Sequence, residues 1–235
     1  MPSPALRVSQ AAPFLPIIPG SINVAVRANG EAMERLLRLA QVLRVGRDQE
    51  IYPQGGNGEF CYRLISGVVR TVALMRDGRR QVGEFYLADD VFGLDSEERR
   101  SFGAEAVTDC TMLRFSTRRV ALLADGDAAF SNLLCRLMRR QLRETREQIL
   151  LLGRKTATER VATFLLEMEA RAGDGPDVVA LPMSRGDIAD HLGLTVETVS
   201  RVLSRLHRDG AIALESAHRV IVTNRDTLLS AAELH

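Results

Sequence analysis

The chain has 235 residues and an almost balanced charge, with 31 Lys and Arg against 30 Asp and Glu. An apolar share of 46% and a charged share of 26% are ordinary for globular proteins, which excludes disordered and collagen-like chains. No run of 18 apolar residues occurs, so a transmembrane helix is not expected. The near-neutral total gives no bulk argument for nucleic acid or membrane surfaces.

The three cysteines, Cys61, Cys110 and Cys135, are odd in number and widely spaced. A secreted disulfide framework would be denser, so a reducing cytoplasm is the expected location. They form no CxxC motif or Cys/His cluster, which argues against zinc and iron–sulfur sites. We expect three buried structural thiols, with a thiol switch as a weakly supported alternative.

Residues 1–28 are expected to form an irregular arm, because five prolines fall within the first twenty residues and interrupt any signal-peptide stretch. Apolar residues at helical spacing then predict a short amphipathic helix over Gly30–Leu43.

Residues 29–126 are expected to form an antiparallel β-roll or barrel. Short apolar or β-branched runs alternate with Gly-rich turns, and Asp77-Gly78 between two such runs is a hairpin signal. The expected strands are Glu50–Tyr52, Phe60–Ile65, Val68–Leu74, Gln81–Tyr86 and Thr111–Phe115.

A long helix is predicted over residues 127–153. An apolar seam follows alternating spacings of three and four, as in a coiled-coil heptad, through Cys135, Met138, Leu142, Thr145, Ile149 and Leu152. Packing against the same chain could explain part of the seam. We expect two copies of the chain to pair through Met138, Leu142, Thr145, Ile149 and Leu152.

Residues 154–235 begin with an amphipathic helix over Thr156–Arg171 and continue with the pattern of a helix-turn-helix. Ser184 can cap a first helix with Asp187 three positions on, and Gly193 suits a left-handed exit from it. Thr195 can cap a second helix over residues 195–208. A β-hairpin, the wing of a winged helix, is predicted from Ala211–Leu214 and Arg219–Thr223.

The second helix carries two different faces. The residues expected to face a core are Val196, Val199, Val202, Leu203 and Leu206. The opposite stripe is polar: Glu197, Ser200, Arg201, Ser204, Arg205 and Arg208. A solvated helix face is the alternative interpretation. One acid ahead of several arginines favours base reading, since Glu can accept from cytosine N4 and Arg can bond guanine O6 and N7.

A barrel, a long helix and a winged helix-turn-helix in this order resemble the Crp/Fnr family of bacterial transcription regulators, which implies an α+β fold. The resemblance is strongest over Ser184–Val222, where Glu197-Thr198-Val199-Ser200-Arg201 looks like the Fnr and FixK branch. Patterns of the family's barrel are matched at Glu50–Gly55 and Ser66–Arg70.

The resemblance implies that Glu197, Ser200 and Arg201 read the bases of a TTGAT-type inverted repeat. The residues expected to contact the DNA backbone are Ser184, Arg185, Thr195, Thr198, Ser204 and Arg205. The implied partners are double-stranded palindromic DNA, a second copy of the chain and RNA polymerase, and no membrane.

The sensor half does not match the ligand-binding branches of the family. Phe92-Gly93 is followed by Leu94, where the cyclic-AMP branch has the glutamate that holds the ribose, and Arg100-Ser101 is then expected to be an ordinary loop pair. No cysteine precedes Cys61 to complete an iron–sulfur set. The four histidines begin at His191, so the barrel offers no heme ligand.

These departures resemble FixK proteins, activators of microaerobic respiration and nitrogen-fixation genes, and imply a regulator without cofactor or ligand. A small-molecule-gated regulator with an unidentified effector in the barrel is the alternative. An enzyme is not expected, because the chain has no GxSxG, HExxH, P-loop or dinucleotide motif.

Overall fold

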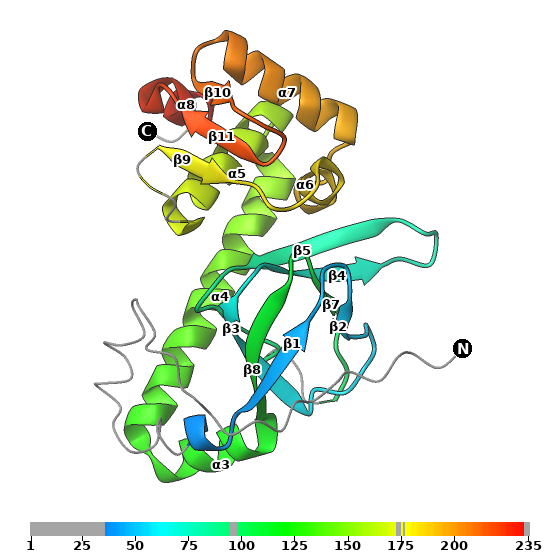
Figure 1. Ribbon diagram of the computed structural model, residues 1–235, viewed down its shortest axis with the longest axis vertical. Coiled ribbons are helices and arrows are strands. Elements are labelled where there is room, and N and C mark those ends of the chain that lie inside the picture. The colour runs from blue at the N-terminus through cyan, green and yellow to red at the C-terminus, as the bar shows by residue number, and fades with distance from the viewer. Residues whose placement is uncertain (1–35, 95–97, 173–174, 176, 233–235) are drawn as a thin grey trace. The chain divides into compact units, whose positions relative to one another are not determined.

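The computed structural model describes residues 36–94, 98–172, 175 and 177–232, so the arm expected over residues 1–28 lies outside the described residues. The chain forms two compact units. The first takes in the chain up to Thr71 together with Phe85–Leu142, and the second takes in Val72–Glu84 together with Arg143–His235. Figure 1 labels the elements, which combine antiparallel sheets with helices as the α+β expectation requires.

Eight strands make the β-roll. They are β1 (Gln41–Val45), β2 (Glu50–Tyr52), β3 (Phe60–Ser66), β4 (Val69–Leu74), β5 (Arg80–Tyr86), β6 (Val91–Phe92), β7 (Gly103–Ala106) and β8 (Cys110–Ser116). One sheet has the order β1-β8-β3-β6 and the other β2-β7-β4-β5. Strand β8 pairs antiparallel with both β1 and β3, which places it inside the first sheet.

The five strands expected from alternating apolar residues are β2, β3, β4, β5 and β8. The helix predicted over Gly30–Leu43 is wrong at its C-terminal end. Among the described residues, helical backbone covers 36–38, and Gln41 already begins β1. Leu43 and Val45 of β1 are buried on alternate positions against β8, and this pairing outweighs the helical spacing of the apolar residues.

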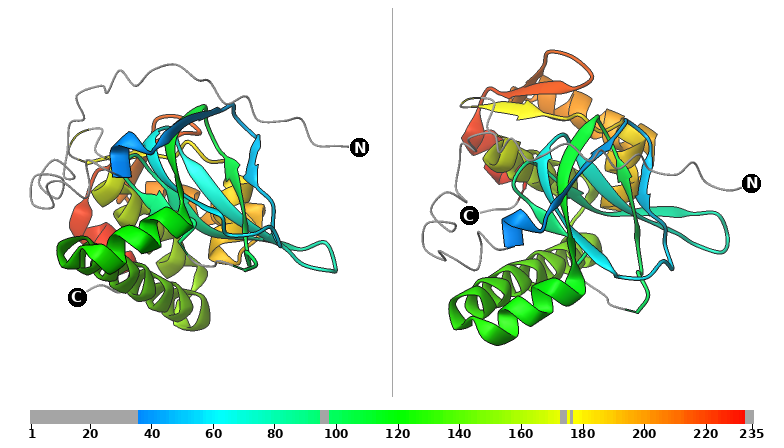
Figure 2. Two further views of the ribbon diagram at one scale, coloured as in Figure 1. Left: turned by 90° about the horizontal axis from the view of Figure 1, so that it is seen from below. Right: turned by 60° about the horizontal axis from the view of Figure 1, so that its bottom comes forward.

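Two helices follow the roll, α3 (Thr117–Gly126) and α4 (Ala128–Arg154), and both views of Figure 2 show the start of α4 beside α3. The carboxylate of Asp127 accepts from the backbone N–H groups of Ala129 and Phe130 at 2.9 and 3.0 Å, so this residue caps α4. An apolar cluster joins these helices to the outer face of the first sheet: Leu36, Cys61, Leu113, Phe115, Val120 and Phe130.

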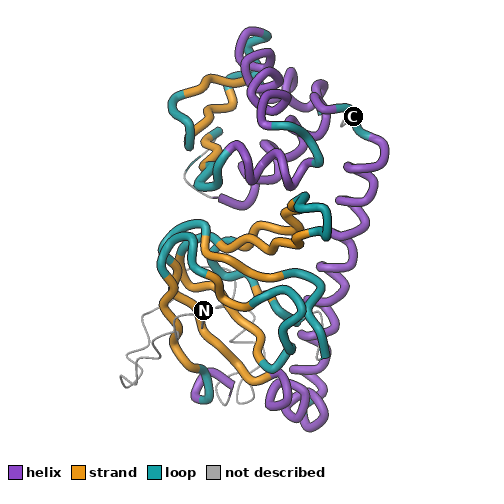
Figure 3. The backbone as a smooth tube through the Cα atoms, turned by 90° about the vertical axis from the view of Figure 1, so that its right-hand side faces the viewer, coloured by secondary structure: helices purple, strands orange, loops and turns teal. Residues whose placement is uncertain are grey.

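The second unit contains the remaining elements, drawn as helices and strands in Figure 3. They are α5 (Ala157–Ala172), β9 (Val178–Ala180), α6 (Arg185–Leu192), α7 (Val196–Arg208), β10 (Ile212–Leu214), β11 (Arg219–Val222) and α8 (Arg225–Ala231). Strand β11 lies between β10 and β9 in a three-stranded sheet. The predicted wing is therefore present, and β9 and α8 are additional to the expectation.

Candidate DNA-binding site

Helix α6 begins at a reciprocal cap. The backbone N–H of Asp187 donates to Ser184 Oγ at 3.0 Å, and Asp187 Oδ2 accepts from the backbone N–H of Ser184 at 3.1 Å. Gly193 ends the helix in the left-handed conformation with φ 62°, which a glycine adopts without the steric cost of a Cβ. The expected start and end of this helix are both confirmed.

Helix α7 follows from an N-cap at Thr195, whose Oγ1 accepts from the N–H of Thr198 at 3.2 Å. Its inner face is buried through Val199, Val202, Leu203 and Leu206. The prediction that Val196 faces the core is wrong, because 43% of its surface is exposed. Val196 is the first residue of the helix, ahead of the turn at which the apolar face meets the core.

The polar stripe of α7 is exposed along its length: Glu197, Ser200, Arg201, Ser204, Arg205 and Arg208. The pKa of Glu197 is lowered by hydrogen bonds from its own backbone N–H and then from the Thr195 side chain, which keeps an acceptor carboxylate at the helix start. Arg201 Nη2 lies 3.4 Å from Thr198 Oγ1, one turn earlier. The three expected base readers thus share one exposed face within the first two turns.

The expected backbone-contacting residues lie around the starts of α6 and α7. Ser184 and Thr195 are exposed N-caps, and Thr198 is half-buried. The Ser204 hydroxyl donates to the carbonyl of Ser200 at 3.0 Å, and Arg205 pairs with Asp209 at 3.6 Å, so both make contacts within their own helix region.

Arg185 is the first residue of α6 and is half-buried. Burial lowers the pKa of its guanidinium, and its Nη1 has no hydrogen-bond partner among the described residues. Its predicted contact with a phosphate stays a prediction.

One structural residue of the site was missed from the sequence. Arg160 of α5 donates to the carbonyl of Leu192 at 2.9 Å and to the carbonyls of Leu152 and Lys155 at 2.8 and 2.9 Å. It therefore satisfies terminal carbonyls of both α4 and α6 with one side chain. A single arginine in an amphipathic helix carries no sequence signal for this role.

The seam of α4 is open to solvent in the single chain. Met138, Leu142 and Ile149 are 58%, 52% and 64% exposed, Thr145 is exposed, and Leu152 is half-buried. Cys61 and Cys110 are buried as predicted, but Cys135 is exposed, so the prediction of three buried thiols is wrong at this position. The reason is that Cys135 lies on the seam, whose neighbouring side chains Met138 and Leu142 are exposed as well.

Aromatic side chains pack against one another in the core of the β-roll, among aliphatic ones. Tyr62 and Phe92 stack with ring centroids 5.1 Å apart, Tyr86 and Phe92 at 5.1 Å, and Tyr52 and Tyr62 at 5.6 Å. The prediction that Arg100 is an ordinary loop residue is wrong. It is 2% exposed, lies 3.8 Å above the Tyr52 ring and donates to the carbonyl oxygens of Asn57 and Phe60.

Two family models match the chain. A cyclic nucleotide-binding domain matches residues 42–127, and a Crp-like helix-turn-helix domain matches residues 159–231. The nitrogen fixation regulation protein FixK of Azorhizobium caulinodans is 42% identical over 212 residues, which cover 86% of each chain. The chain belongs to the Crp/Fnr family. It is therefore a DNA-binding transcription regulator of that family and not an enzyme.

Other relatives agree with this assignment. The transcriptional activator protein FnrL of Cereibacter sphaeroides is 32% identical and aligns over 89% of this chain and 87% of its own. The solved structure of FixK2 from Bradyrhizobium japonicum is 42% identical, with a TM-score of 0.78, and covers 82% of this chain and 96% of its own. The expected fold and the resemblance to the FixK branch are confirmed.

The residues of this member of the Crp/Fnr family depart from the expected cyclic-nucleotide set, since Leu94 and not a glutamate follows Phe92-Gly93. Aromatic side chains pack in the core of the roll, and Arg100 donates through Nε and Nη2 to carbonyls of its own chain. A Cβ at Gly93, which has φ 76°, would lie 2.9 Å from Arg100 Nη1. The backbone at Gly93 thus approaches the guanidinium of Arg100 in a conformation that favours glycine.

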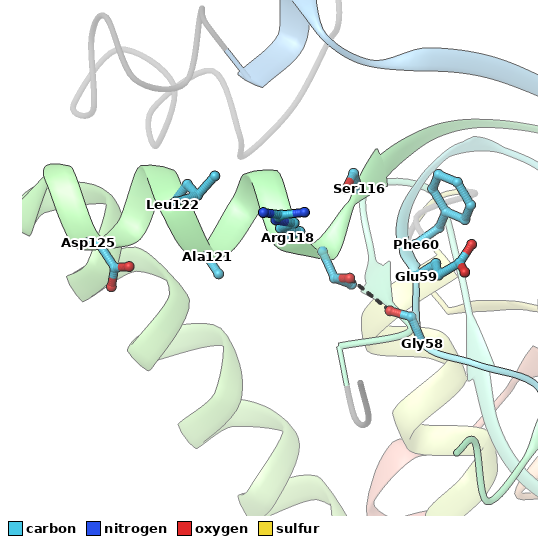
Figure 4. A pocket seen from close by; sticks show the side chains of 9 residues that line it. Gly58, Glu59, Phe60, Ser116, Arg118, Ala121, Leu122 and Asp125 are labelled. Atoms are coloured by element: carbon cyan, nitrogen blue, oxygen red, sulfur yellow. Dashed lines mark hydrogen bonds between the residues drawn. The ribbon is translucent and has the colours of Figure 1, made fainter. Parts of the chain in front are cut away.

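A separate hollow of about 550 Å³ lies on the outside of the first unit (Figure 4). It is lined by Gly58, Glu59, Phe60, Ser116, Thr117, Arg118, Ala121, Leu122 and Asp125, and the Thr117 hydroxyl donates to the Gly58 carbonyl at 2.8 Å. Its charges are mixed in sign, which favours no single class of ligand.

Within the described ranges, no group of three or more His, Cys, Asp or Glu is placed to hold a metal ion. No helix in the part of the chain that the structure describes is long and apolar enough to cross a membrane.

Proposed function

We propose that the chain is a homodimeric, sequence-specific transcription activator that reads a TTGAT-type inverted repeat through residues 195–208. The observation that carries the proposal is the exposed stripe of α7, with Glu197, Ser200 and Arg201 on one face and a buried apolar face behind them. In this assignment residues 29–126 are the β-roll, 127–153 the dimer helix and 154–235 the DNA-binding domain.

The dimer is supported by the seam of α4. A row of large apolar side chains exposed at heptad spacing is unfavourable in water and is buried when two copies pair. Two-fold symmetry then presents two copies of α7 to successive major grooves about 34 Å apart. An inverted repeat is the DNA symmetry that such a dimer matches.

Action without a ligand is supported by the filled roll and by the engaged side chain of Arg100. The names of the FixK relatives support the proposal that the chain controls nitrogen-fixation genes. We propose that it also controls genes of microaerobic and anaerobic respiration. An activator of this kind works in the cytoplasm, where the chromosome is, and contacts RNA polymerase.

The test is binding of purified, ligand-free protein to a TTGAT inverted repeat and to a scrambled duplex. Arg201→Ala should weaken operator binding by roughly 1–3 kcal/mol per half-site and relax the preference at its guanine, because a bidentate contact to the base is lost. Arg44→Ala, at an exposed arginine of β1, is the matched control and should bind like the parent. Unchanged base preference in Arg201→Ala would refute the assignment of the reader.

A small-molecule-gated regulator is the second candidate, favoured by the match of residues 42–127 to the cyclic nucleotide-binding domain model. Calorimetry with cyclic nucleotides, run beside operator binding with and without them, separates the two candidates. Heat of binding together with nucleotide-dependent operator affinity would support the gated regulator. No heat and full affinity without nucleotide would support the ligand-independent one.

A further inference from the structure

The hairpin of β4 and β5 contacts the helix-turn-helix with consecutive residues of β5. Residues Val72–Glu84 belong to the same compact unit as α5, α6 and α7 (Figures 1 and 3). Gln81 Nε2 lies 3.4 Å from the carbonyl of His191, and the carbonyl of Val82 lies 3.3 Å from His191 Nδ1. Glu84 pairs with Arg171 of α5 at 3.8 Å. The hairpin therefore reaches α6 and its supporting helix.

The strongest of these contacts is made by Arg80. Its Nη1 and Nη2 donate to Asp187 Oδ1 at 2.9 and 3.0 Å, and Nη1 also donates to Asp190 Oδ2 at 2.8 Å. Asp187 is buried, with 4% of its side chain exposed, whereas Asp190 and Arg80 are about one third exposed. One guanidinium therefore bridges two carboxylates that lie one turn apart on α6 and offsets one of their two negative charges.

The carboxylate of Asp187 connects this ion pair to the start of α6. While Oδ1 accepts from Arg80, Oδ2 accepts from the backbone N–H and the hydroxyl of Ser184 at 3.1 and 2.8 Å. Because both of its carboxylate oxygens accept hydrogen bonds, the Asp187 side chain is held in the rotamer that completes the N-terminal cap of α6. Removal of Arg80 would leave a buried charge without its cation and favour a rotamer turned towards water.

Arg80 also changes the electrostatic charge that DNA meets near the start of α6. Residues 156–235 carry 8 basic and 12 acidic residues, a net charge of −4. Arg80 comes from outside this stretch and offsets one of the two negative charges nearest the start of α6, where helix N-termini meet phosphate. Burial lowers the pKa of Arg80, but the bonds to Asp187 and Asp190 outweigh it and raise the pKa overall, so the cation is retained.

We propose that Arg80 is a positioning residue for DNA binding, which holds the cap of α6 and screens Asp187 and Asp190 from the DNA backbone. The proposal rests on the proposed function, since it concerns the same DNA-binding site. It adds the β4–β5 hairpin to the parts of the chain that set operator affinity. The hairpin leaves the reader face of α7 exposed, so Arg80 affects affinity and not the choice of base.

The test compares Arg80→Gln with Arg79→Gln in the full-length protein. Arg79 is the matched control, because it is the neighbouring arginine, is 75% exposed and pairs with Asp77 of its own turn. Arg80→Gln should weaken binding to the TTGAT repeat about tenfold, with the base preference unchanged, because a charged hydrogen-bonded pair is broken. Arg79→Gln should stay within about twofold of the parent.

A second substitution separates charge from packing. Asp190→Asn in the Arg80→Gln background removes one of the two carboxylates that lose this cation and should recover affinity at least about threefold, an effect that a purely structural loss would not show. Hydrogen exchange at the amides of Asp187 and Ile188 should be faster in Arg80→Gln and unchanged in Arg79→Gln, because both amides bond to Ser184. Equal affinities of the two single variants, or no recovery in the double variant, would overturn the proposal.

An Arg80→Gln protein that does not fold is replaced by Arg80→Lys, which keeps the charge but loses the two-nitrogen fork. A loss of about threefold then supports the proposal, and parent affinity overturns it. The parent's preference for the TTGAT repeat over a scrambled duplex tests the proposed function separately. If that preference is absent, the effect of Arg80 is still measured on a non-specific duplex and by the exchange of the α6 amides.

Discussion

At the scale of single residues, burial sets the protonation state of His191 in the helix-turn-helix. His191 lies at the end of α6, 6% exposed, with its ring against Phe164. Its pKa is lowered to about 4, mainly by burial; hydrogen bonds to the carbonyls of Val82 and Gly83 partly offset this, and the positive charge of Arg171 adds to the lowering. The folded protein therefore keeps a neutral imidazole where the unfolded chain binds a proton.

This difference predicts a pH dependence of stability. The unfolded pKa is 6.5, so the contribution of His191 is fully present above about pH 6.5 and is lost as pH falls towards 4. The loss at pH 4 is roughly 3 kcal/mol for a shift of this size. His191→Phe should flatten the fall in urea-unfolding free energy between pH 7 and 5. An NMR titration that shows the His191 ring protonating near pH 6.5 in the folded protein would contradict the argument.

At the scale of elements, sequence periodicity predicted the parts whose pattern is local. The cap pair Ser184 and Asp187, the exit at Gly193 and the two faces of α7 follow from spacing within one helix, and they are present. β1 was missed because its strand conformation depends on pairing with β8, some seventy residues away. The contacts of Arg80 and Arg160 were missed for the same reason, since their partners lie in other elements.

The seam of α4 gives the prediction at this scale. Ile149→Asn should raise the dimer dissociation constant roughly ten- to a hundredfold in sedimentation equilibrium, because it replaces a large apolar side chain that the proposed dimer buries. Leu122→Asn is the matched control, since Leu122 of α3 is 62% exposed and lies off the seam. If both variants weaken the dimer equally, or neither does, the seam is not the interface.

At the scale of the whole molecule, the balanced charge conceals an uneven distribution. Residues 136–155 carry a net +5 and residues 156–235 a net −4. The net charge of the C-terminal region therefore gives little non-specific attraction to DNA, and the proposed function places affinity on individual contacts of α7 and of the helix starts.

The stability of the β-roll gives a further prediction at this scale. Phe92 is 1% exposed and stacks with Tyr62 and Tyr86, so Phe92→Ala should lower the free energy of unfolding by about 3–5 kcal/mol through lost burial and a residual cavity. Leu74→Ala, at a residue 61% exposed on β4, should cost less than about 0.5 kcal/mol. Cyclic AMP should leave the melting temperature of the parent and of Phe92→Ala unchanged, because Arg100 is buried and its Nε and Nη2 donate to carbonyls of its own chain. A concentration-dependent rise in either melting temperature would show that the roll binds the nucleotide, and the ligand-independent regulator would then be the wrong description.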